Sequence, residues 1–161
     1  MEKILRDRLN DQIEKEIYSA YLYLSMAAYF EYEGWKGFSH WMKKQAQEEV
    51  GHAMKLFEFL NDRGERVILK EIPQPPVEFN SPVEVFEKVL EHEKKITGWI
   101  NELYSLAKEV GDNPTVVFLE WFITEQVEEE RNATEILTKL RKIKPDSGVF
   151  FMLDKVLGER E

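Results

Sequence analysis

Hydrophobic residues recur along the chain at alternating intervals of three and four, the spacing of a helix face buried in a bundle. Four long segments have this pattern: about residues 3–33, about 35–63, 82 to about 110, and 113 to about 143. A shorter pattern over about residues 146–158 carries Val149, Phe150, Met152, Leu153, Val156 and Leu157. The pattern predicts an all-α protein: a four-helix bundle over about residues 3–143, followed by a short C-terminal helix.

Cap residues mark where the third and fourth helices begin. Ser81, Pro82 and Glu84 occupy the positions of an N-cap, a first helical proline and a capping box. Asn113 precedes Pro114 and is the predicted N-cap of the fourth helix. For the short last helix, Asp146 or Ser147 is the predicted cap.

Residues 65 to about 81 interrupt the helical pattern with Pro73, Pro75 and Pro76. A segment of this length reaches about 55 Å when extended, whereas a helix of 28 residues is about 42 Å long. The segment can therefore run the length of the bundle and return the chain to its starting end. We predict one long crossover, between the second and third helices.

Each of the four long segments has one hydrophobic helix face, which we call its seam. A carboxylate interrupts each seam, at Glu16, Glu49, Glu93 and Glu129. Glu16 lies 18 residues before the break at Gly34 and Glu49 lies 15 residues after it, so the two are level within about 5 Å. The same comparison across the turn near residue 113 places Glu93 and Glu129 level within about 6 Å. The first two long helices form one antiparallel hairpin and the last two form another. Because the crossover brings these two hairpins into register, the four carboxylates should converge inside the bundle.

His52 and Gln126 lie in the same seams, so an imidazole and an amide join the carboxylates. Glu49 and His52, three residues apart on one helix face, can bind one metal ion together. Buried carboxylates cannot all stay ionised without cations, and no Lys or Arg occupies these mid-helix seam positions. Carboxylates with a single imidazole favour non-haem iron or manganese over zinc. Five ligating side chains with one shared carboxylate indicate two metals.

Other residues near these positions admit two interpretations. Tyr23 could pack in the core or have a redox role, and Gln126 could be a buried amide with backbone partners. His40 and His92 are interpreted as ordinary surface or rim residues. His92 points about 100° away from Glu93 and is not counted as a ligand.

A second acidic group lies beside the seams. Glu125 and Glu128 share one side of the fourth helix, and Glu48 precedes Glu49 on the second. These three could form a satellite cation site or a solvated charged face, and the sequence does not decide between them.

Composition narrows the class of protein. At 161 residues the chain is long enough for one domain with a substantial core. Its net charge of −9 argues against nucleic acid as a partner and is typical of a protein that attracts cations. The absence of cysteine excludes disulfides and thiolate metal sites. No apolar segment resembles a signal peptide or a membrane span, so we expect a soluble, cytoplasmic protein that does not bind membranes.

Over nearly its whole length the chain resembles the non-haem bacterial-type ferritins. The resemblance rests on the long crossover, the short last helix and four segments: Glu16-Ile17-Tyr18-Ser19, Gln45-Ala46-Gln47-Glu48-Glu49-Val50-Gly51-His52, His92-Glu93 and Glu125-Gln126-Val127-Glu128-Glu129-Glu130.

This resemblance implies a ferritin-like bundle with a di-iron ferroxidase centre. The first iron would be bound by Glu16, Glu49 and His52; the second would be bound by Glu93, Glu129 and Glu49 as a bridge.

Further roles follow from the same resemblance. Gln126 would hydrogen-bond bound oxygen or water, while Tyr23 and the aromatic ring of Trp121 would lie beside the centre. A third iron site would use Glu48, Glu125, Glu128 and Glu129.

The resemblance also implies an assembly and a reaction. The family forms a hollow cage of 24 subunits, with the short last helix at the four-fold axes. Such a cage oxidises Fe²⁺ with O₂ or H₂O₂ and stores the Fe³⁺ as a mineral.

Two departures separate the chain from close relatives of these ferritins. Bacterioferritins have a haem-binding Met after the Glu of the first Glu-x-x-His, where this chain has Val50, and they have a second Glu-x-x-His, where this chain has Gln126-Val127-Glu128-Glu129. We therefore expect no haem. The missing cysteines exclude the additional iron domain of rubrerythrins.

Two other functions remain open from the sequence. One is a di-iron oxidase or peroxidase of the same bundle class that acts on a small molecule without storing iron. The other is a structural bundle that binds no metal.

Overall fold

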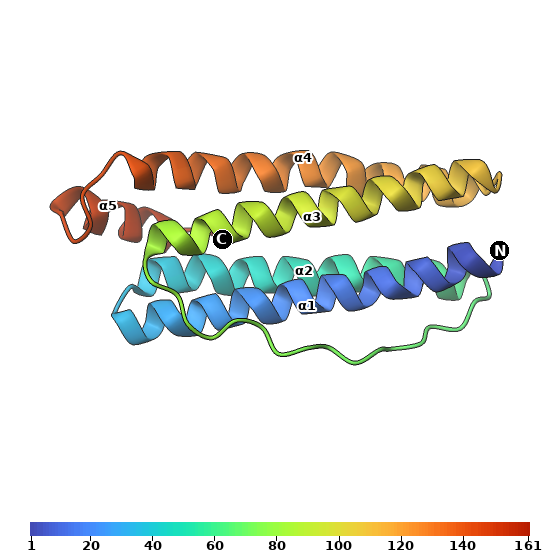
Figure 1. Ribbon diagram of the computed structural model, residues 1–161, viewed down its shortest axis with the longest axis horizontal. Coiled ribbons are helices and arrows are strands. Elements are labelled where there is room, and N and C mark those ends of the chain that lie inside the picture. The colour runs from blue at the N-terminus through green and yellow to red at the C-terminus, as the bar shows by residue number, and fades with distance from the viewer.

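The computed structural model describes residues 1–161 and contains five α-helices and no strands (Figure 1). Their bounds are α1 Lys3–Glu33, α2 Lys36–Asp62, α3 Pro82–Glu109, α4 Asn113–Arg141 and α5 Gly148–Leu157. The four long helices lie side by side, and α5 packs across the end of the bundle where α1 turns into α2 (Figure 1). The predicted all-α bundle with a short last helix is confirmed. No helix combines the length and the apolar character that a membrane span requires.

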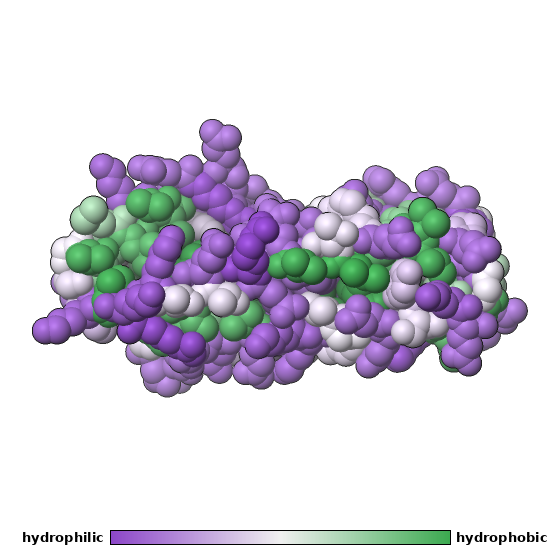
Figure 2. Space-filling model, turned by 90° about the horizontal axis from the view of Figure 1, so that it is seen from above, coloured by the Kyte–Doolittle hydropathy of each residue, from purple (hydrophilic) through white to green (hydrophobic).

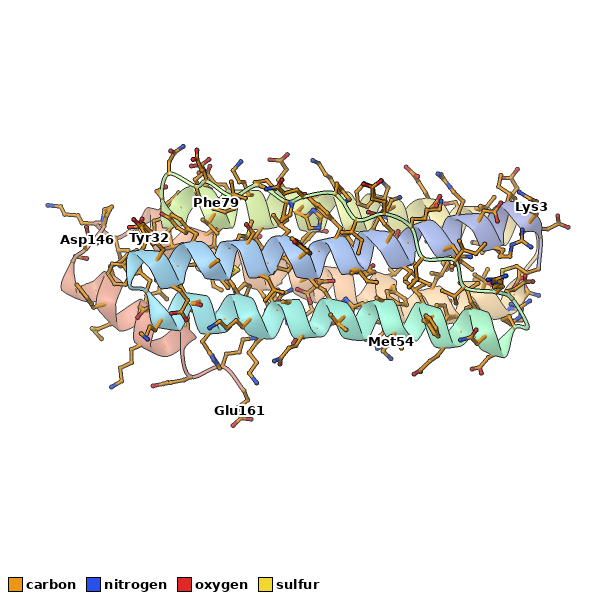
Figure 3. The ribbon with its side chains drawn as sticks, turned by 90° about the horizontal axis from the view of Figure 1, so that it is seen from below. Lys3, Tyr32, Met54, Phe79, Asp146 and Glu161 are labelled. Atoms are coloured by element: carbon orange, nitrogen blue, oxygen red, sulfur yellow. The ribbon has the colours of Figure 1, made fainter.

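The predicted crossover between α2 and α3 is also confirmed. The segment runs along the bundle beside α1 from one end to the other (Figure 1). Side chains of α1 satisfy part of its backbone: Asn10 Oδ1 accepts a hydrogen bond from Ile68 N at 2.8 Å, and Ser25 Oγ donates to Pro76 O at 2.5 Å. Phe79, labelled in Figure 3, is buried near the end of the segment. The crossover is thus fixed to α1 and aligns the two hairpins.

The N-cap of α3 is the one predicted. Ser81 Oγ accepts a hydrogen bond from Glu84 N at 3.1 Å, and the Glu84 carboxylate accepts from Asn80 N at 2.7 Å. The carboxylate thus reaches one residue beyond the N-cap that a standard capping box would use.

The predicted cap of α4 is wrong by one residue. Asp112, not Asn113, caps the helix, and its Oδ1 accepts from Thr115 N at 3.1 Å. Arg63 at the end of α2 donates to both Asp112 carboxylate oxygens at 2.8 and 3.0 Å. This ion pair between the two hairpins lowers the pKa of Asp112 and keeps the cap ionised.

The hydrophobic core is divided into two clusters by a polar layer. One cluster lies toward α5 and contains Phe30, Phe38 and Phe86. The other lies toward the N-terminus and contains Leu56 and Ile100. The layer between them holds the carboxylates that interrupt the seams, because those residues fall between the two sets of core positions on every helix.

Helix α5 is joined to α2 through Asp154. Trp35 gives α2 no side-chain cap. The Asp154 carboxylate instead accepts a hydrogen bond from Phe38 N at 3.0 Å, in the first turn of α2. The two helices approach so closely that a Cβ at Gly37 would lie 1.6 Å from the Asp154 carbonyl oxygen.

Ser147 caps α5, one of the two residues predicted for this role, and accepts from Phe150 N at 3.3 Å. Of the apolar residues predicted to define α5, only Phe150 and Leu157 are buried. The others leave hydrophobic surface at this end of the molecule, visible in Figure 2, and include Val149, Met152 and Val156.

Substituting Gly37 by Ala should displace α5 from α2. The added methyl group meets backbone at Asp154, which cannot move without shifting α5, and such overpacking costs about 1–3 kcal/mol. A thermal unfolding midpoint below that of the unsubstituted protein is expected at matched concentration. Gly98→Ala is the control, because a Cβ there meets no atom within 4 Å. That change should stabilise its helix by about 0.5–1 kcal/mol. Equal shifts in the two variants would contradict the close approach.

Candidate metal centre

The first group of potential ligands joins α1 to α2. One ligand atom from each of Glu16, Glu49 and His52 lies within 4.8 Å of the others, and all three residues are buried. His52 Nδ1 is 3.1 Å from Glu49 Oε2 and 3.8 Å from Glu16 Oε2. The Nδ1 atom therefore faces the carboxylates and is the imidazole nitrogen placed to bind a metal.

The second group joins α2 to α3 and α4. Ligand atoms of Glu49, Glu93 and Glu129 again lie within 4.8 Å of one another, and all three residues are buried. Glu49 belongs to both groups. The four helices therefore form two adjacent groups of three potential ligands that share one carboxylate, and each helix contributes a glutamate.

Two glutamines support these carboxylates, and sequence reasoning assigned neither of them a role. Gln12 Nε2 donates to Glu16 Oε1 at 2.8 Å, and Gln45 Nε2 donates to Glu129 Oε2 at 2.5 Å and lies 3.5 Å from Glu49 Oε1. Each glutamine lies four residues before a seam glutamate, a spacing that places both on one helix face. This spacing is the signal that could have identified them.

Gln126 and Tyr23 both contact Glu93. Gln126 Nε2 lies 3.0 Å from Glu93 Oε2 and 3.2 Å from the Glu93 carbonyl oxygen. The Tyr23 hydroxyl donates to the other Glu93 carboxylate oxygen and is fully buried. Burial, followed by the charge of Glu93, raises the pKa of Tyr23 well above 10, so the phenol stays protonated as a donor.

Burial and charge crowding affect the titration of Glu49, Glu93, Glu129 and His52. Burial raises the pKa of Glu49 and Glu93, and their mutual repulsion raises that of Glu49 further. Burial, together with the charge of Glu93, raises the pKa of Glu129 to about 8. Burial alone would lower the pKa of His52, but Glu16 and Glu49 outweigh it and raise this pKa to about 11. Without metal, protons take the place of cations here.

Glu16 provides an independent observation that the site suits a cation. Its Oε2 atom is buried and has no hydrogen-bond partner. An unpaired carboxylate oxygen in the interior is costly unless something binds it. Because this atom faces His52 Nδ1 at 3.8 Å, a cation between them would satisfy it. The oxygen-rich donor set with one nitrogen fits iron or manganese better than zinc.

Of the residues expected at a satellite or third metal site, Glu125 and Glu129 belong to one group, whereas Glu48 and Glu128 each pair with an arginine. Glu125 Oε1 lies 3.7 Å from His52 Nε2, on the side of the imidazole away from Glu49, and forms a cluster with His52 and Glu129. Glu48 pairs with Arg160 at 2.9 Å, and exposed Glu128 lies 3.7 Å from Arg131. Glu125 thus faces the outer nitrogen of His52, the position from which carboxylates often orient a metal-binding imidazole.

His92 was expected at the surface or rim, and this expectation is wrong. It is 8% exposed, and its Nε2 atom is 2.7 Å from Ser19 Oγ. The turn of the helix that directs His92 away from Glu93 points it at α1 instead of solvent. Burial lowers its pKa to about 4, so it is neutral. His40 is half-buried, with Nε2 2.6 Å from the Arg160 carbonyl oxygen.

Trp121 lies against the imidazole of His52. The centroid of its ring, on α4, is 5.4 Å from that of His52, and the two rings are nearly perpendicular. Lys55 Nζ lies 4.1 Å from the centroid of the Trp121 ring. The indole therefore packs beside the imidazole of His52.

Comparisons with known proteins agree with this geometry. A family model described as the ferritin-like domain matches residues 6–143. A bacterial non-heme ferritin of Bacteroides fragilis is 43% identical over 156 residues, which is 97% of each chain. A bacterial non-heme ferritin of Staphylococcus aureus is 35% identical over 160 residues, 99% of this chain and 96% of that one.

Solved structures give the same result. An open-pore ferritin from the hyperthermophilic archaeon Archaeoglobus fulgidus superimposes with a TM-score of 0.98 at 49% identity, over 100% of this chain and 98% of that one. A humanized archaeal ferritin superimposes with a TM-score of 0.98 at 48% identity, over 100% of this chain and 99% of that one. The bundle with its carboxylate centre thus defines a ferritin-like protein. The chain belongs to the ferritin family.

The raised pKa values predict how pH acts on the protein without metal. Glu129 ionises near 4.5 when unfolded but near 8 when folded, so the folded state keeps a proton over that range. The pKa of His52 rises from 6.5 to about 11 on folding, so the folded state also keeps the imidazole proton between these pH values. The thermal unfolding midpoint of metal-free protein should therefore fall as pH rises from 5 toward 8.

Metal should reverse this trend because it displaces those protons. Added Co²⁺, a stable substitute for Fe²⁺, should raise the midpoint more at pH 8 than at pH 6. Glu129→Gln should reduce the pH dependence. Stabilisation by Co²⁺ that is equal at both pH values would contradict the assignment.

Proposed function

We propose that this protein is an iron-storage ferritin whose bundle centre is a ferroxidase site. Fe²⁺ is its substrate, O₂ or H₂O₂ is the oxidant, and the Fe³⁺ product is stored as a mineral inside an oligomeric cage. The observation that carries the proposal is the shared position of Glu49 between two buried three-residue groups. Family membership and the full-length similarity to bacterial non-heme ferritins support it.

The proposed ligand sets follow from these groups. One Fe²⁺ would be bound by Glu16, Glu49 and His52 Nδ1, and the second by Glu49, Glu93 and Glu129. Each Fe²⁺ gives up one electron, so a pair of ions held together supplies the two electrons that reduce O₂ to H₂O₂ or H₂O₂ to water. Holding both ions beside one oxidant is the contribution of the protein.

The protein also favours the oxidised product electrostatically. Four carboxylates around two ions stabilise Fe³⁺ more than Fe²⁺, because the attraction grows with the charge of the cation. His52 and the carboxylates must give up their protons when Fe²⁺ binds. Gln126 contacts one carboxylate oxygen of Glu93 and Tyr23 contacts the other, and both residues are proposed to orient this carboxylate.

We place a third iron site, used during transfer, at Glu125 and Glu129 with Glu48 and Glu128 at the surface. Glu125 already lies 3.7 Å from His52 Nε2, so it connects the exposed acidic residues to the centre. Iron leaving the centre would meet carboxylates along this path. No haem is included in the proposal, because Val50 has no atom that could bind haem iron.

The exposed hydrophobic surface of α5 supports assembly. Val149, Met152 and Val156 are each more than half exposed, and with Ile143 and Leu153 they line a groove of about 310 Å³. Apolar surface of this kind marks a contact with another molecule. We propose that it packs against other copies in a cage of 24 subunits.

Removing the shared ligand should stop fast iron oxidation. Glu49→Gln takes a ligand from both sites at once, so the initial rate of Fe²⁺ oxidation in air should fall at least about tenfold. The rate is measured by Fe³⁺ absorbance. The control Glu58→Gln changes an exposed glutamate on the same helix and should leave the rate unchanged. Unchanged initial kinetics in Glu49→Gln would refute the assignment.

Storage predicts a large, iron-filled particle. Light scattering and iron analysis after aerobic loading should show a closed assembly that holds far more iron than its sites can bind. A small oligomer holding a few irons per chain would instead favour a di-iron oxidase of the same bundle class. No iron binding at all would favour a purely structural bundle.

A further inference from the structure

The last residues of the chain return to the centre of the bundle through Arg160. After α5 the chain lies beside α2, where Glu161 is labelled in Figure 3. The Arg160 side chain is 19% exposed, low for a residue next to a chain end. Termini are usually poorly ordered unless specific contacts fix them, so the contacts of this residue identify what holds the tail.

The guanidinium of Arg160 contacts one stripe of α2. Its Nη1 atom donates to the Trp41 carbonyl oxygen at 3.1 Å, and its Nη2 atom donates to Gln45 Oε1 at 3.0 Å and Glu48 Oε2 at 2.9 Å. These residues are spaced four and three apart and share a helix face. The guanidinium carbon also lies 4.6 Å from the Trp41 ring centroid.

A backbone contact reinforces the docking. The Arg160 carbonyl oxygen lies 2.6 Å from His40 Nε2, which must carry the hydrogen because a carbonyl only accepts. The tail is thus held by both the side chain and the backbone of one residue. The planar guanidinium donates to α2 from two separate nitrogens in a fixed geometry, whereas an ammonium group has only one nitrogen.

Gln45 connects this contact to the metal centre. The guanidinium has only donors, so it requires the Gln45 amide oxygen to face the tail. The amide nitrogen then faces inward, where it donates to Glu129 Oε2 at 2.5 Å and lies 3.5 Å from Glu49 Oε1. Gln45 is 1% exposed, so no solvent competes for either end of its side chain.

We propose that Arg160 is a positioning residue of the metal centre: through Gln45 it fixes the orientation of Glu129 and so couples docking of the C-terminal tail to metal binding. The Gln45 bond engages one oxygen of Glu129, which directs the other oxygen toward the metal. Outer partners that orient ligands change metal affinity by about 10–100-fold when they are removed. Arg160 acts one bond further out, so a smaller effect is expected.

The proposal has a reciprocal consequence. If a docked tail raises metal affinity, bound metal must strengthen tail docking by the same factor. This second effect can be measured without any iron oxidation. The inference rests on the proposed metal site, but its tests separate the two ideas.

The test uses Co²⁺ binding to the full-length assembled protein, measured by calorimetry and by Co²⁺ visible absorbance. Arg160→Ala should weaken Co²⁺ binding about three- to tenfold. Arg160→Lys keeps the positive charge but loses the two separate donor nitrogens of the guanidinium, so it should also weaken Co²⁺ binding. A purely electrostatic role predicts the opposite: normal affinity with Lys and higher affinity with Ala, because a positive charge repels Co²⁺. That result would overturn the proposal.

Two controls complete the design. Lys155→Ala removes an exposed positive charge from α5 and should leave affinity unchanged. A double-mutant cycle with Gln45→Ala tests the route, because Arg160→Ala should have no further effect once Gln45 is absent. Additive losses would overturn the proposed route. Circular dichroism and particle size confirm that each variant folds and assembles.

Hydrogen exchange supplies the reciprocal measurement. Co²⁺ should slow exchange of backbone amides in residues 155–161 of the unsubstituted protein and should not do so in Gln45→Ala. Unchanged exchange in the unsubstituted protein, with Co²⁺ bound, would overturn the coupling while leaving the metal site intact. If the unsubstituted protein bound no Co²⁺, the proposed function itself would fail instead.

Discussion

The structure depends on the burial of like charges at the middle of a four-helix bundle. Four glutamates and a histidine lie at most 5% exposed in the interior, where an unpaired charge is costly and one carboxylate raises the pKa of the next. The proposed metal ions would remove this cost, and protons remove part of it when metal is absent. The cost also shapes the core, because the polar layer divides the hydrophobic side chains into two clusters.

Positioning of the carboxylates is distributed over distant parts of the chain. The crossover, hydrogen-bonded to α1, sets the register of the two hairpins, and the Arg63–Asp112 ion pair connects them at one end. At the centre, Gln12 and Gln45 each fix a carboxylate from an adjacent turn of helix or from a neighbouring helix. Helix α5 packs against Gly37 and so directs the tail along α2. The ligand geometry therefore depends on contacts far from the ligands.

Much of this could be predicted from the sequence, because helix periodicity and turn spacing are local quantities. The interrupted seams predicted which side chains would meet at the centre, and Glu16, Glu49, Glu93 and Glu129 do meet there. Local rules failed at the start of α4, where Asn113 was predicted to cap the helix but Asp112 does so, held by Arg63 from the other helix pair. They also failed for His92, which was expected to be exposed. Its position one residue before Glu93 shows in which direction the side chain points, but not that α1 packs against it.

Long-range contacts of the tail could not be predicted at all. Arg160 and Gln45 are 115 residues apart, and nothing in the pattern near either residue indicates the other. The grouping of Glu125 with His52 is similar, because helix spacing alone allowed Glu125 to face Glu48 equally well. Such contacts depend on how α5 and α4 pack against α2, which is a property of the folded chain.

In the proposed di-iron site, Glu49 is shared between two metal ions. Anomalous diffraction from crystals soaked anaerobically in Fe²⁺ would locate both ions. This arrangement predicts two iron peaks in the bundle centre, one beside His52 and one beside Glu129, with an oxygen of Glu49 bound to each. A single peak, or two peaks of which only one contacts Glu49, would contradict it.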